Sequence, residues 1–470
     1  MKEIIVVPTG LGAGEETKGE ATRFFARVVE ADTIWRSGGC QSGHHIMAED
    51  GREQMFSHFG SGTFEGRKTY LKHMVINPTD LFEEAVQLEK KGIKNAFELM
   101  TIDESCISIT PYHGAISRLR ELVRDENKKG TIGMGVGEAI KDSRDSNLTV
   151  RAGDFGGEET KLIEKVEGIR QYKLEQATKL LNGQTNLSEE IMAELEILND
   201  RELVQTTVDS FKYTAKLFRI SGDEFLTDLI TRGESLVTET SHGALLHPEY
   251  GFAPHTTQVD PTAQDVLKTL VEKEYGGKIV KVGVTRCYTT RHGAGPLVSF
   301  SEEMSKTIKE THNNEKQIWN EWLGSFRNGN FDVVATKYAL GISGGPQNFG
   351  GLIISYMDEL AKYDKWEVCE GYKISNDETE TDNYFEMENG IILGIKKTSE
   401  INLEHQMELT RLLKKCSPLL KILEKTDDKT LEEIFIEYVE DKLKVPVVAL
   451  GYGKGINDRK IRPGYEKLFR

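Results

Sequence analysis

Charged and imidazole side chains lie in two glycine-rich turns near the start of the chain. Glu15 and Lys18 belong to the run Thr-Gly-Leu-Gly-Ala-Gly-Glu-Glu-Thr-Lys-Gly-Glu at 9–20, and His44 closes the run Ser-Gly-Gly-Cys-Gln-Ser-Gly-His at 37–44. A lysine supplies a cation for phosphate oxygens, and carboxylates can bind Mg²⁺ or transfer protons. These residue types therefore favour phosphate and metal chemistry.

Other interpretations of the first turn stay open. The spacing of Gly10, Gly12 and Gly14 is close to a dinucleotide-binding fingerprint but lacks the third glycine at the required position. The turn is not a true Walker A motif, because Lys18 is followed by glycine and not by serine or threonine. A glycine turn with a purely structural role is the remaining interpretation.

The elements that must position these turns can be predicted from the apolar pattern. Residues 4–7 and 33–36 predict buried strands, each followed by one of the turns, and a helix is expected after the first. Strand, glycine loop and helix is the arrangement that directs backbone N–H groups and a helix N-terminus at a phosphate. Further strands are expected over 73–78 and 106–113, the latter leading into a helix that ends at Arg124. A helix is expected over 81–91, capped by Asp80 and ended by Gly92.

This alternation of strands and helices predicts an α/β fold. We expect one large domain, residues 1–470, around a mostly parallel β-sheet with a P-loop-like phosphate loop. Residues 156–235 are charged and helical in pattern and form a helical subregion without evident chemistry.

Composition narrows the class of protein. The 470 residues carry a formal charge of −16, which makes a nucleic-acid polymer an unlikely partner. No apolar run approaches the 18 or so residues of a membrane-spanning helix, and the N-terminus reads as a strand and not as a signal peptide. The five cysteines are scattered and form no Cys-x-x-Cys pair. We therefore expect a reduced, cytoplasmic protein without a disulfide framework, a zinc site or a membrane partner.

Both turns resemble loops of the adenylosuccinate synthetase family. Residues 14–20 are similar to its Gly-Asp-Glu-Gly-Lys-Gly-Lys loop, and residues 38–44 to its Gly-Gly-His-Asn-Ala-Gly-His. The resemblance implies that Glu15 is the general base, that His44 is the general acid, and that Glu15 and Gly43 bind Mg²⁺. It also implies that a nucleoside triphosphate binds to the first loop, at Gly14, Glu16, Thr17, Lys18 and Gly19.

Later segments extend the resemblance over the whole chain. Residues 130–139 resemble the family's Gly-Thr-Thr-Gly-Arg-Gly-Ile-Gly-Pro-Ala, which holds the substrate phosphate, although Ile132 and Met134 replace its second threonine and its arginine. Residues 288–296 are similar to Tyr-Thr-Thr-Arg-Val-Gly-x-Gly-Pro. Arg144, or else Arg151, would be the arginine that the partner subunit contributes. The implied contacts to the substrate nucleotide are Gln41, Thr131, Gly133, Arg144, His242 in place of a glutamine, Thr257 and Arg291.

Two segments depart from the family pattern. The family's arginine-rich aspartate loop corresponds to residues 320–332, where Arg327 is the arginine that remains for the amino-acid substrate. The family's guanine-reading Thr-Lys-Leu-Asp is aligned with residues 352–355, which places Ile353 and Ile354 against the base and leaves no carboxylate there. The last loop keeps Gly451 and Gly453 as triphosphate contacts. Because guanine needs an acceptor for its N1–H and 2-amino protons, we expect ATP to be favoured over GTP.

The resemblance implies an NTP- and Mg²⁺-dependent ligase of purine nucleotide biosynthesis that acts as a homodimer. Such an enzyme joins an amino acid, aspartate in the family, to a 6-oxopurine nucleotide through a 6-phosphoryl intermediate. Three alternatives stay open: a synthetase that acts on dGMP or GMP in a 2-aminoadenine pathway, a ligase or kinase with a different amine or none, and an inactive nucleotide-binding sensor. The purine, the amine and the oligomeric state are not determined by the sequence.

Overall fold

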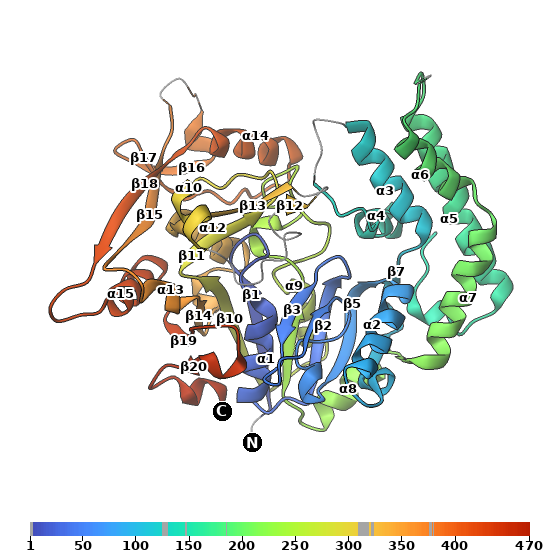
Figure 1. The fold of residues 1–470 in the computed structure, drawn as a ribbon, viewed down its shortest axis with the longest axis horizontal. Coiled ribbons are helices and arrows are strands. Elements are labelled where there is room, and N and C mark those ends of the chain that lie inside the picture. Colours follow the sequence, from blue (N-terminus) through green and yellow to red (C-terminus); the bar gives the residue numbers. More distant parts are fainter. Residues whose placement is uncertain are drawn as a thin grey trace.

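Two sheets and a group of helices make up the molecule. The computed structural model describes residues 3–124, 130–145, 148–184, 186–308, 319–320, 324–375, 378 and 380–470. A large sheet lies in the centre, with a smaller sheet on one side and helices α3 to α7 on the other (Figure 1). Within the described residues the large sheet has eleven strands, and every pair is parallel except the terminal β19–β20 pair.

The strands of the large sheet follow here in spatial order, with β7 beside β5: β20 (Arg459–Ile461), β19 (Val447–Gly451), β14 (Gly351–Ser355), β10 (Lys278–Arg286), β1 (Ile4–Gly10), β9 (Leu236–Thr240), β2 (Thr33–Gly39), β5 (Lys68–Ile76), β7 (Ile107–Ser108), β6 (Met100–Asp103) and β8 (Arg219–Ser221). The smaller sheet consists of β11 (Tyr288–His292), β12 (Trp319–Asn320), β13 (Gly324–Asp332), β15 (Lys365–Lys373), β16 (Phe385–Glu388), β17 (Ile391–Ile395) and β18 (Ser417–Glu424). A separate hairpin pairs β3 (His44–Met47) with β4 (Glu53–Phe56).

The described helices are α1 (Lys18–Val28), α2 (Pro78–Lys90), α3 (Pro111–Arg124), α4 (Val136–Asp145), α5 (Glu159–Leu180), α6 (Glu189–Asn199), α7 (Glu202–Leu217), α8 (Glu224–Thr231), α9 (Gln264–Glu272), α10 (Glu302–Thr307), α12 (Val333–Ile342), α13 (Met357–Leu360), α14 (Leu403–Lys414) and α15 (Leu431–Leu443). The subregion predicted as helical, 156–235, contains α5 to α8 together with the short strand β8.

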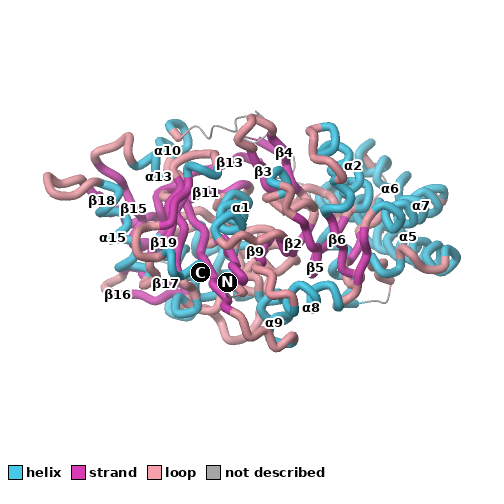
Figure 2. Tube along the Cα trace, turned by 90° about the horizontal axis from the view of Figure 1, so that it is seen from below, coloured by secondary structure: helices cyan, strands magenta, loops and turns pink. Residues whose placement is uncertain are grey.

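The large sheet is buried on both faces, as its continuous apolar strands require. In β1, Ile4 and Val6 pack into one core with α1, whereas Ile5 and Val7 pack into another with α8 and α9. Figure 2 shows α1 on one side of the sheet and α8 and α9 on the other. Successive side chains of a strand point to opposite faces, so a strand covered on both faces has no polar side. This arrangement confirms the predicted α/β class with a mostly parallel sheet; the assignment of 1–470 to one domain stays a prediction.

The start of α2 corrects one sequence prediction. The helix begins at Pro78 and not at residue 81, and its cap is Asn77, whose side chain accepts the Thr79 N–H at 3.2 Å. Proline is favoured at a first helical position because its fixed φ suits the helix and its missing N–H has no partner there anyway. Asp80 therefore lies inside the first turn, where its negative charge interacts favourably with the positive end of the helix dipole. Gly92 follows the helix with φ 86°, as predicted.

The strand predicted over 106–113 is also shorter than expected. Only Ile107–Ser108 pair with β5, and α3 already begins at Pro111.

All five cysteines are free thiols, four of them buried. In the part of the chain that the structure describes, no helix has both the length and the apolar character needed to cross a bilayer.

A buried carboxylate joins the smaller sheet to α12. Asp332 is 2% exposed and caps α12 by accepting the Ala335 N–H at 2.9 Å. The Tyr372 hydroxyl lies 2.8 and 2.9 Å from its two carboxylate oxygens. Burial raises the pKa of the Asp332 carboxyl to about 6, even though these hydrogen bonds favour the charged form.

A carboxyl group whose pKa is higher in the folded than in the unfolded state stabilises the protein fully at a pH below the unfolded pKa, near 4. This stabilisation is lost as the pH rises from there through the folded pKa. We therefore expect wild-type protein to lose stability between pH 4.5 and 7 relative to Asp332→Asn, which keeps the cap but cannot ionise. The expected relative change in unfolding free energy is about 2–3 kcal/mol. Urea unfolding of both proteins at several pH values measures it. A difference between the two that stays constant with pH would contradict the assignment.

Candidate active site

The first glycine loop is closed by its own charged side chains. Glu16 accepts the Gly14 N–H at 2.7 Å through one carboxylate oxygen, and its other oxygen lies 2.9 Å from Lys18 Nζ. Both side chains are buried. Thr17 precedes α1 in the left-handed region (φ 65°), and its hydroxyl donates to Ser355 Oγ at 2.8 Å, at the end of β14. The loop is thus held by its own hydrogen bonds, and a carboxylate lies against Lys18 where a phosphate could bind.

The second glycine turn places His44 beside a buried carboxylate that sequence reasoning missed. Glu239, in β9, is fully buried, and its Oε1 accepts from His44 Nδ1 and from the guanidinium of Arg36. Ser61 donates to the same carboxylate through its N–H at 2.8 Å and its hydroxyl at 2.7 Å. The sequence signal available was a lone acidic residue in a buried strand of the large sheet.

The electrostatics of this group leave one histidine nitrogen for a ligand. Burial opposes the charge of Glu239, but Arg36 and His44 outweigh it and hold the pKa of this carboxyl at about 2. Burial lowers the pKa of His44, and Glu239 offsets that shift only in part. His44 Nε2 is buried and has no hydrogen-bond partner among the described residues, and the side chain lines a large cavity. The imidazole is therefore held through Nδ1 while Nε2 is available to a bound group.

Two cavities meet at the first glycine loop. The larger has a volume of about 1090 Å³ and the smaller about 370 Å³. Glu15, together with Gly14, Gln41 and Gly43, lines both. Of the other predicted site residues, Thr17, Lys18, Gly19, His44 and Gly453 line the larger cavity, and Thr131, His242, Thr257 and Arg291 line the smaller. The structure therefore brings together most of the predicted residues around Glu15.

Five predicted site residues lie outside the linings of these two cavities: Glu16, Gly133, Arg144, Arg327 and Gly451. Glu16 is turned under its loop, and Gly451 is buried in β19. Gly133 faces a separate cavity beside α2 and α3, and Arg144 is exposed, with a 3.4 Å contact to the Gln258 carbonyl. Their assigned ligand contacts stay predictions.

Arg291 is the least satisfied cation of the smaller cavity. It is 2% exposed, and neither Nε nor Nη1 has a hydrogen-bond partner among the described residues. Its cross-strand neighbour is Arg327, which donates to the carbonyls of Gly293 and Gly295 and so braces the turn around Arg291. Burial, and then the charge of Arg327, lower the pKa of Arg291 to about 9. A buried guanidinium without a carboxylate favours an anionic or hydroxyl-rich ligand.

His242 enters the smaller cavity as a neutral imidazole. Burial first, and then the charges of Lys18 and His44, lower its pKa to about 3. Its backbone is left-handed (φ 64°), and its Nδ1 is buried without a partner in the described part of the chain. A neutral imidazole offers one donor and one acceptor, which suits the edge of a purine.

The loop before α4 is packed too closely for side chains at its glycines. A Cβ on Gly135, where φ is 89°, would lie 2.3 Å from the His113 carbonyl carbon. Arg118 donates to the Gly133 carbonyl at 3.0 Å from below the loop. Ile132 and Met134 line both main cavities but bring no polar side-chain donor. The loop can therefore meet an anion mainly with backbone N–H groups.

The far end of the larger cavity corrects the sequence prediction about the base. Ile353 and Ile354 are fully buried in β14, one in each of two hydrophobic cores, so neither can face a nucleotide. The residue at the cavity is instead Asp358, in the first turn of α13. Its Oδ1 is buried and has no partner among the described residues, and burial raises the pKa of the carboxyl. An acceptor for a base is therefore present.

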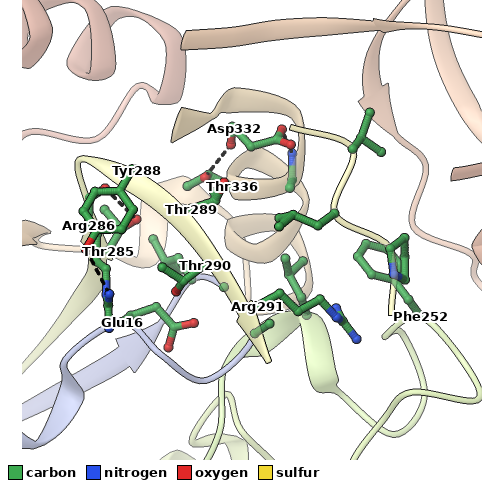
Figure 3. A pocket seen from close by; sticks show the side chains of 18 of the residues that line it. Glu16, Phe252, Thr285, Arg286, Tyr288, Thr289, Thr290, Arg291, Asp332 and Thr336 are labelled. Atoms are coloured by element: carbon green, nitrogen blue, oxygen red, sulfur yellow. Dashed lines mark hydrogen bonds between the residues drawn. The ribbon is translucent and has the colours of Figure 1, made fainter. Parts of the chain in front are cut away.

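A further, small cavity lies between the first glycine loop, β11 and α12. Figure 3 shows Glu16, Arg291 and Asp332 around it. Its volume is about 40 Å³, enough for a few water molecules but not for a purine. We regard it as packing behind the loop and not as a substrate site.

Comparisons with known proteins found relatives over most of the chain. A family model described as adenylosuccinate synthetase matches residues 6–459. The adenylosuccinate synthetase of Clostridium botulinum (strain Alaska E43 / Type E3) is 30% identical over 372 residues, which cover 77% of this chain and 80% of that protein. The enzyme of Neisseria meningitidis (serogroup A / serotype 4A) is 27% identical over 378 residues, covering 79% and 81%.

Two solved structures share the fold. Fully ligated adenylosuccinate synthetase from Plasmodium falciparum matches with a TM-score of 0.72 at 17% identity, over 97% of this chain and 99% of that one. The succinoaminodeoxyadenylate synthetase of cyanophage S-2L, bound to dGMP and to dATP as an energy donor, matches with a TM-score of 0.56 at 14% identity over both whole chains.

The contact between α1 and His44 gives a testable constraint. A Cβ on Gly19 would lie 2.7 Å from His44 Cβ and 2.8 Å from Ser61 Oγ. We expect Gly19→Ala to destabilise the protein by about 1–3 kcal/mol through overpacking, although alanine is the better helix former. Gly341→Ala is the matched control, because Gly341 also lies in a helix, α12, and a Cβ there meets nothing within 4 Å.

Urea unfolding measures both variants, and Gly341→Ala should be neutral or stabilising by up to about 1 kcal/mol. If Gly19→Ala were as stable as its control, the close approach of α1 to His44 would be refuted.

Proposed function

The chain belongs to the adenylosuccinate synthetase family, a family of C–N ligases, and from this premise we propose that it joins an amino group to carbon 6 of a 6-oxopurine nucleotide at the expense of a nucleoside triphosphate. The observation that supports this best is the meeting of the two cavities at Glu15. One cavity contains Lys18 and His44, and the other contains His242 and Arg291. A triphosphate and a nucleotide bound in these cavities would face each other across one carboxylate.

The reaction follows from the roles of these groups. Glu15 removes the N1 proton of the purine, and oxygen 6 attacks the γ-phosphate. The bond to the leaving diphosphate breaks, and a 6-phosphoryl purine forms. The amine, aspartate in the family, then adds at carbon 6 and displaces inorganic phosphate.

His44 acts at the leaving diphosphate. Its Nδ1–H is held by Glu239, so a proton on Nε2 can be donated to a phosphate oxygen while the carboxylate stabilises the imidazolium. An anionic phosphate beside Nε2 favours that proton, which burial otherwise disfavours. Lys18 lies in the same cavity and neutralises phosphate charge, which is the main catalytic contribution in phosphoryl transfer.

The donor groups present fit Mg²⁺. Among the described residues no cluster of three or more His, Cys, Asp or Glu side chains could hold a metal ion. Mg²⁺ in such sites usually takes one or two protein oxygens and completes its shell with phosphate oxygens and water. The Glu15 carboxylate and the Gly43 carbonyl, which border the same cavity, would hold it. When bound, Mg²⁺ would neutralise charge on the phosphates.

Asp358 changes the expectation about the phosphate donor. The preference for ATP was inferred from Ile353 and Ile354 facing the base, and the burial of both removes that premise. The Asp358 carboxylate is half-buried at the cavity, and its Oδ1, which has no partner among the described residues, can accept a hydrogen bond from the N1–H or 2-amino group of guanine. We propose that Asp358 makes GTP the preferred donor.

The substrate nucleotide has two candidate classes. IMP is the 6-oxopurine nucleotide of the family reaction. dGMP is the second candidate, because the chain also shares its fold with a phage synthetase solved with dGMP and dATP. Aspartate is proposed as the amine on family grounds, and Arg327 as its contact. We also propose a cytoplasmic homodimer in which Arg144, exposed on α4, reaches the partner's site.

A turnover screen tests this function. IMP, GMP and dGMP are each incubated with GTP or ATP, Mg²⁺ and aspartate, and products are identified by mass spectrometry. An aspartyl adduct of one purine nucleotide is the expected result. A phosphorylated product without adduct would indicate a kinase, and tight binding without any turnover would indicate a sensor.

Glu15 and His44 give the catalytic prediction. Glu15→Gln and His44→Asn should each lower turnover by roughly 10² or more, because each removes a proton-transfer group. Glu15→Asp is the matched control and should retain activity, since it keeps the carboxylate. Steady-state rates with the purine found in the screen provide the measurement. Activity in Glu15→Gln within a few-fold of wild type would exclude the carboxylate as the base.

Asp358 gives the donor prediction. Wild-type protein should bind GTP more tightly than ATP, and Asp358→Asn should weaken GTP by about tenfold or more while ATP changes little, since a hydrogen bond to a charged group contributes about 1.5–3 kcal/mol. Glu359→Gln is the control, because that neighbouring carboxylate is paired with Lys362 at 2.7 Å. Calorimetry with Mg²⁺ gives the constants. If wild-type protein bound ATP more tightly than GTP and Asp358→Asn changed neither binding constant, the preference for ATP predicted from the sequence would hold instead.

A further inference from the structure

One wall of the smaller cavity carries cationic side chains that were not among the predicted site residues. Arg120 on α3 and Lys141 on α4 both line it. Arg120 Nε lies 3.2 Å and Lys141 Nζ lies 3.3 Å from the same oxygen of Glu138, in the first turn of α4. Arg120 also donates to Gln176 at 2.8 Å, which fixes its guanidinium between α3, α4 and α5.

The ion pairs behind this wall leave positive charge at the cavity. The other carboxylate oxygen of Glu138 lies 3.3 Å from Lys173, which is fully buried and also lies 2.7 Å from Asp142. Arg120, Lys141 and Lys173 thus share the two carboxylates of Glu138 and Asp142. His113, 3.1 Å from Asp142, can only add positive charge to this group. The surplus lies on Arg120 and Lys141, because Lys173 is enclosed.

The neighbouring loop offers an anion a single side-chain donor. Ile132 and Met134 are apolar, whereas the Thr131 hydroxyl, which accepts the Gly133 N–H at 3.3 Å, keeps its own O–H for a ligand. Behind this loop, α4 begins at Val136, so the positive end of its dipole lies at the cavity as well. On the opposite wall Arg291 is buried with two donor nitrogens unpartnered among the described residues. Both walls of the cavity therefore select for an anionic ligand.

We propose that Arg120 and Lys141 bind the phosphate group of the substrate nucleotide, in place of the further polar side chains that this loop lacks. The proposal rests on the proposed function in one respect, that a purine nucleoside monophosphate enters the smaller cavity. It assigns the phosphate to the α3–α4 wall, and the purine to the side of Glu15 and His242. A guanidinium and an ammonium together suit a phosphate dianion, with Arg120 giving direction and Lys141 giving charge.

Arg124 provides a matched control on the same helix face. It lines the same cavity one turn after Arg120, but it is paired with Glu121, whose other oxygen accepts the Gly130 N–H at 3.1 Å. Its charge is therefore neutralised locally. Arg120→Gln, Lys141→Gln and Arg124→Gln each remove one positive charge and leave a shorter, polar side chain, so the net charge changes equally in all three.

The test compares ligands that differ only in the phosphate. Calorimetry measures the binding of IMP, GMP and dGMP, and of inosine, guanosine and deoxyguanosine, to wild-type protein and the three variants. Wild type should bind at least one monophosphate more tightly than its nucleoside. That ratio should fall by about tenfold in Arg120→Gln and in Lys141→Gln, with nucleoside binding unchanged, and should stay within about twofold in Arg124→Gln.

Each outcome decides the proposal. Unchanged nucleoside binding shows that a variant is folded, so a lost phosphate preference then supports the assignment. A preference that survives in Arg120→Gln and Lys141→Gln, falls equally in Arg124→Gln, or is missing in wild type overturns it. Turnover is measured separately. If wild-type protein transfers aspartate and the variants keep the phosphate preference, this assignment is refuted and the proposed function stands. If the variants lose the phosphate preference and wild-type protein shows no turnover, this assignment stands and the proposed function is refuted.

Discussion

The contact of Arg36 and His44 with one oxygen of Glu239 is the interaction on which the rest of the site depends. The carboxylate is fully enclosed, and desolvating it is unfavourable unless its partners stay in place. Arg36 also donates to the carbonyls of Ser42, Phe56 and Phe59. A single guanidinium thereby joins β2, the second glycine turn and the end of the β3–β4 hairpin. Any motion that frees His44 removes one partner of this buried charge, although Arg36 and Ser61 still contact it.

The parallel sheet explains why these groups meet. The two glycine turns and the turn before Asp358 follow the carboxyl ends of β1, β2 and β14, and such ends lie at one edge of a parallel sheet. Thr17 and Ser355 illustrate the result, because a residue after β1 and the last residue of β14 are joined by a hydrogen bond across 338 positions of sequence. Small residues allow this convergence: a side chain at Gly19 would press on His44, and one at Gly135 on His113. Catalytic spacing is therefore set by backbone packing.

The sequence predicted those features that depend on interactions between residues close together in the chain. The glycine turns and the alternation of strands and helices depend on neighbouring residues, and both were predicted. Glu239 pairs with Arg36 and His44, which are distant in sequence, and Arg120 and Lys141 meet at one cavity from different helices, so no spacing rule identifies these residues. Ile353 and Ile354 show a second limit. The alignment with the family's Thr-Lys-Leu-Asp placed the base contact on residues 352–355, but it could not show that this apolar run is a strand buried on both faces and that Asp358, three residues further on, lines the cavity.

The central claim is that oxygen 6 of the purine becomes a phosphate ester before the amine arrives. Labelling that oxygen tests it directly: IMP and dGMP carrying ¹⁸O at position 6 are turned over with Mg²⁺, aspartate and a triphosphate, and inorganic phosphate is analysed by mass spectrometry. The account predicts one ¹⁸O atom in the phosphate released for each adduct formed. Unlabelled phosphate alongside adduct would show that the oxygen leaves as water, and would contradict the 6-phosphoryl mechanism.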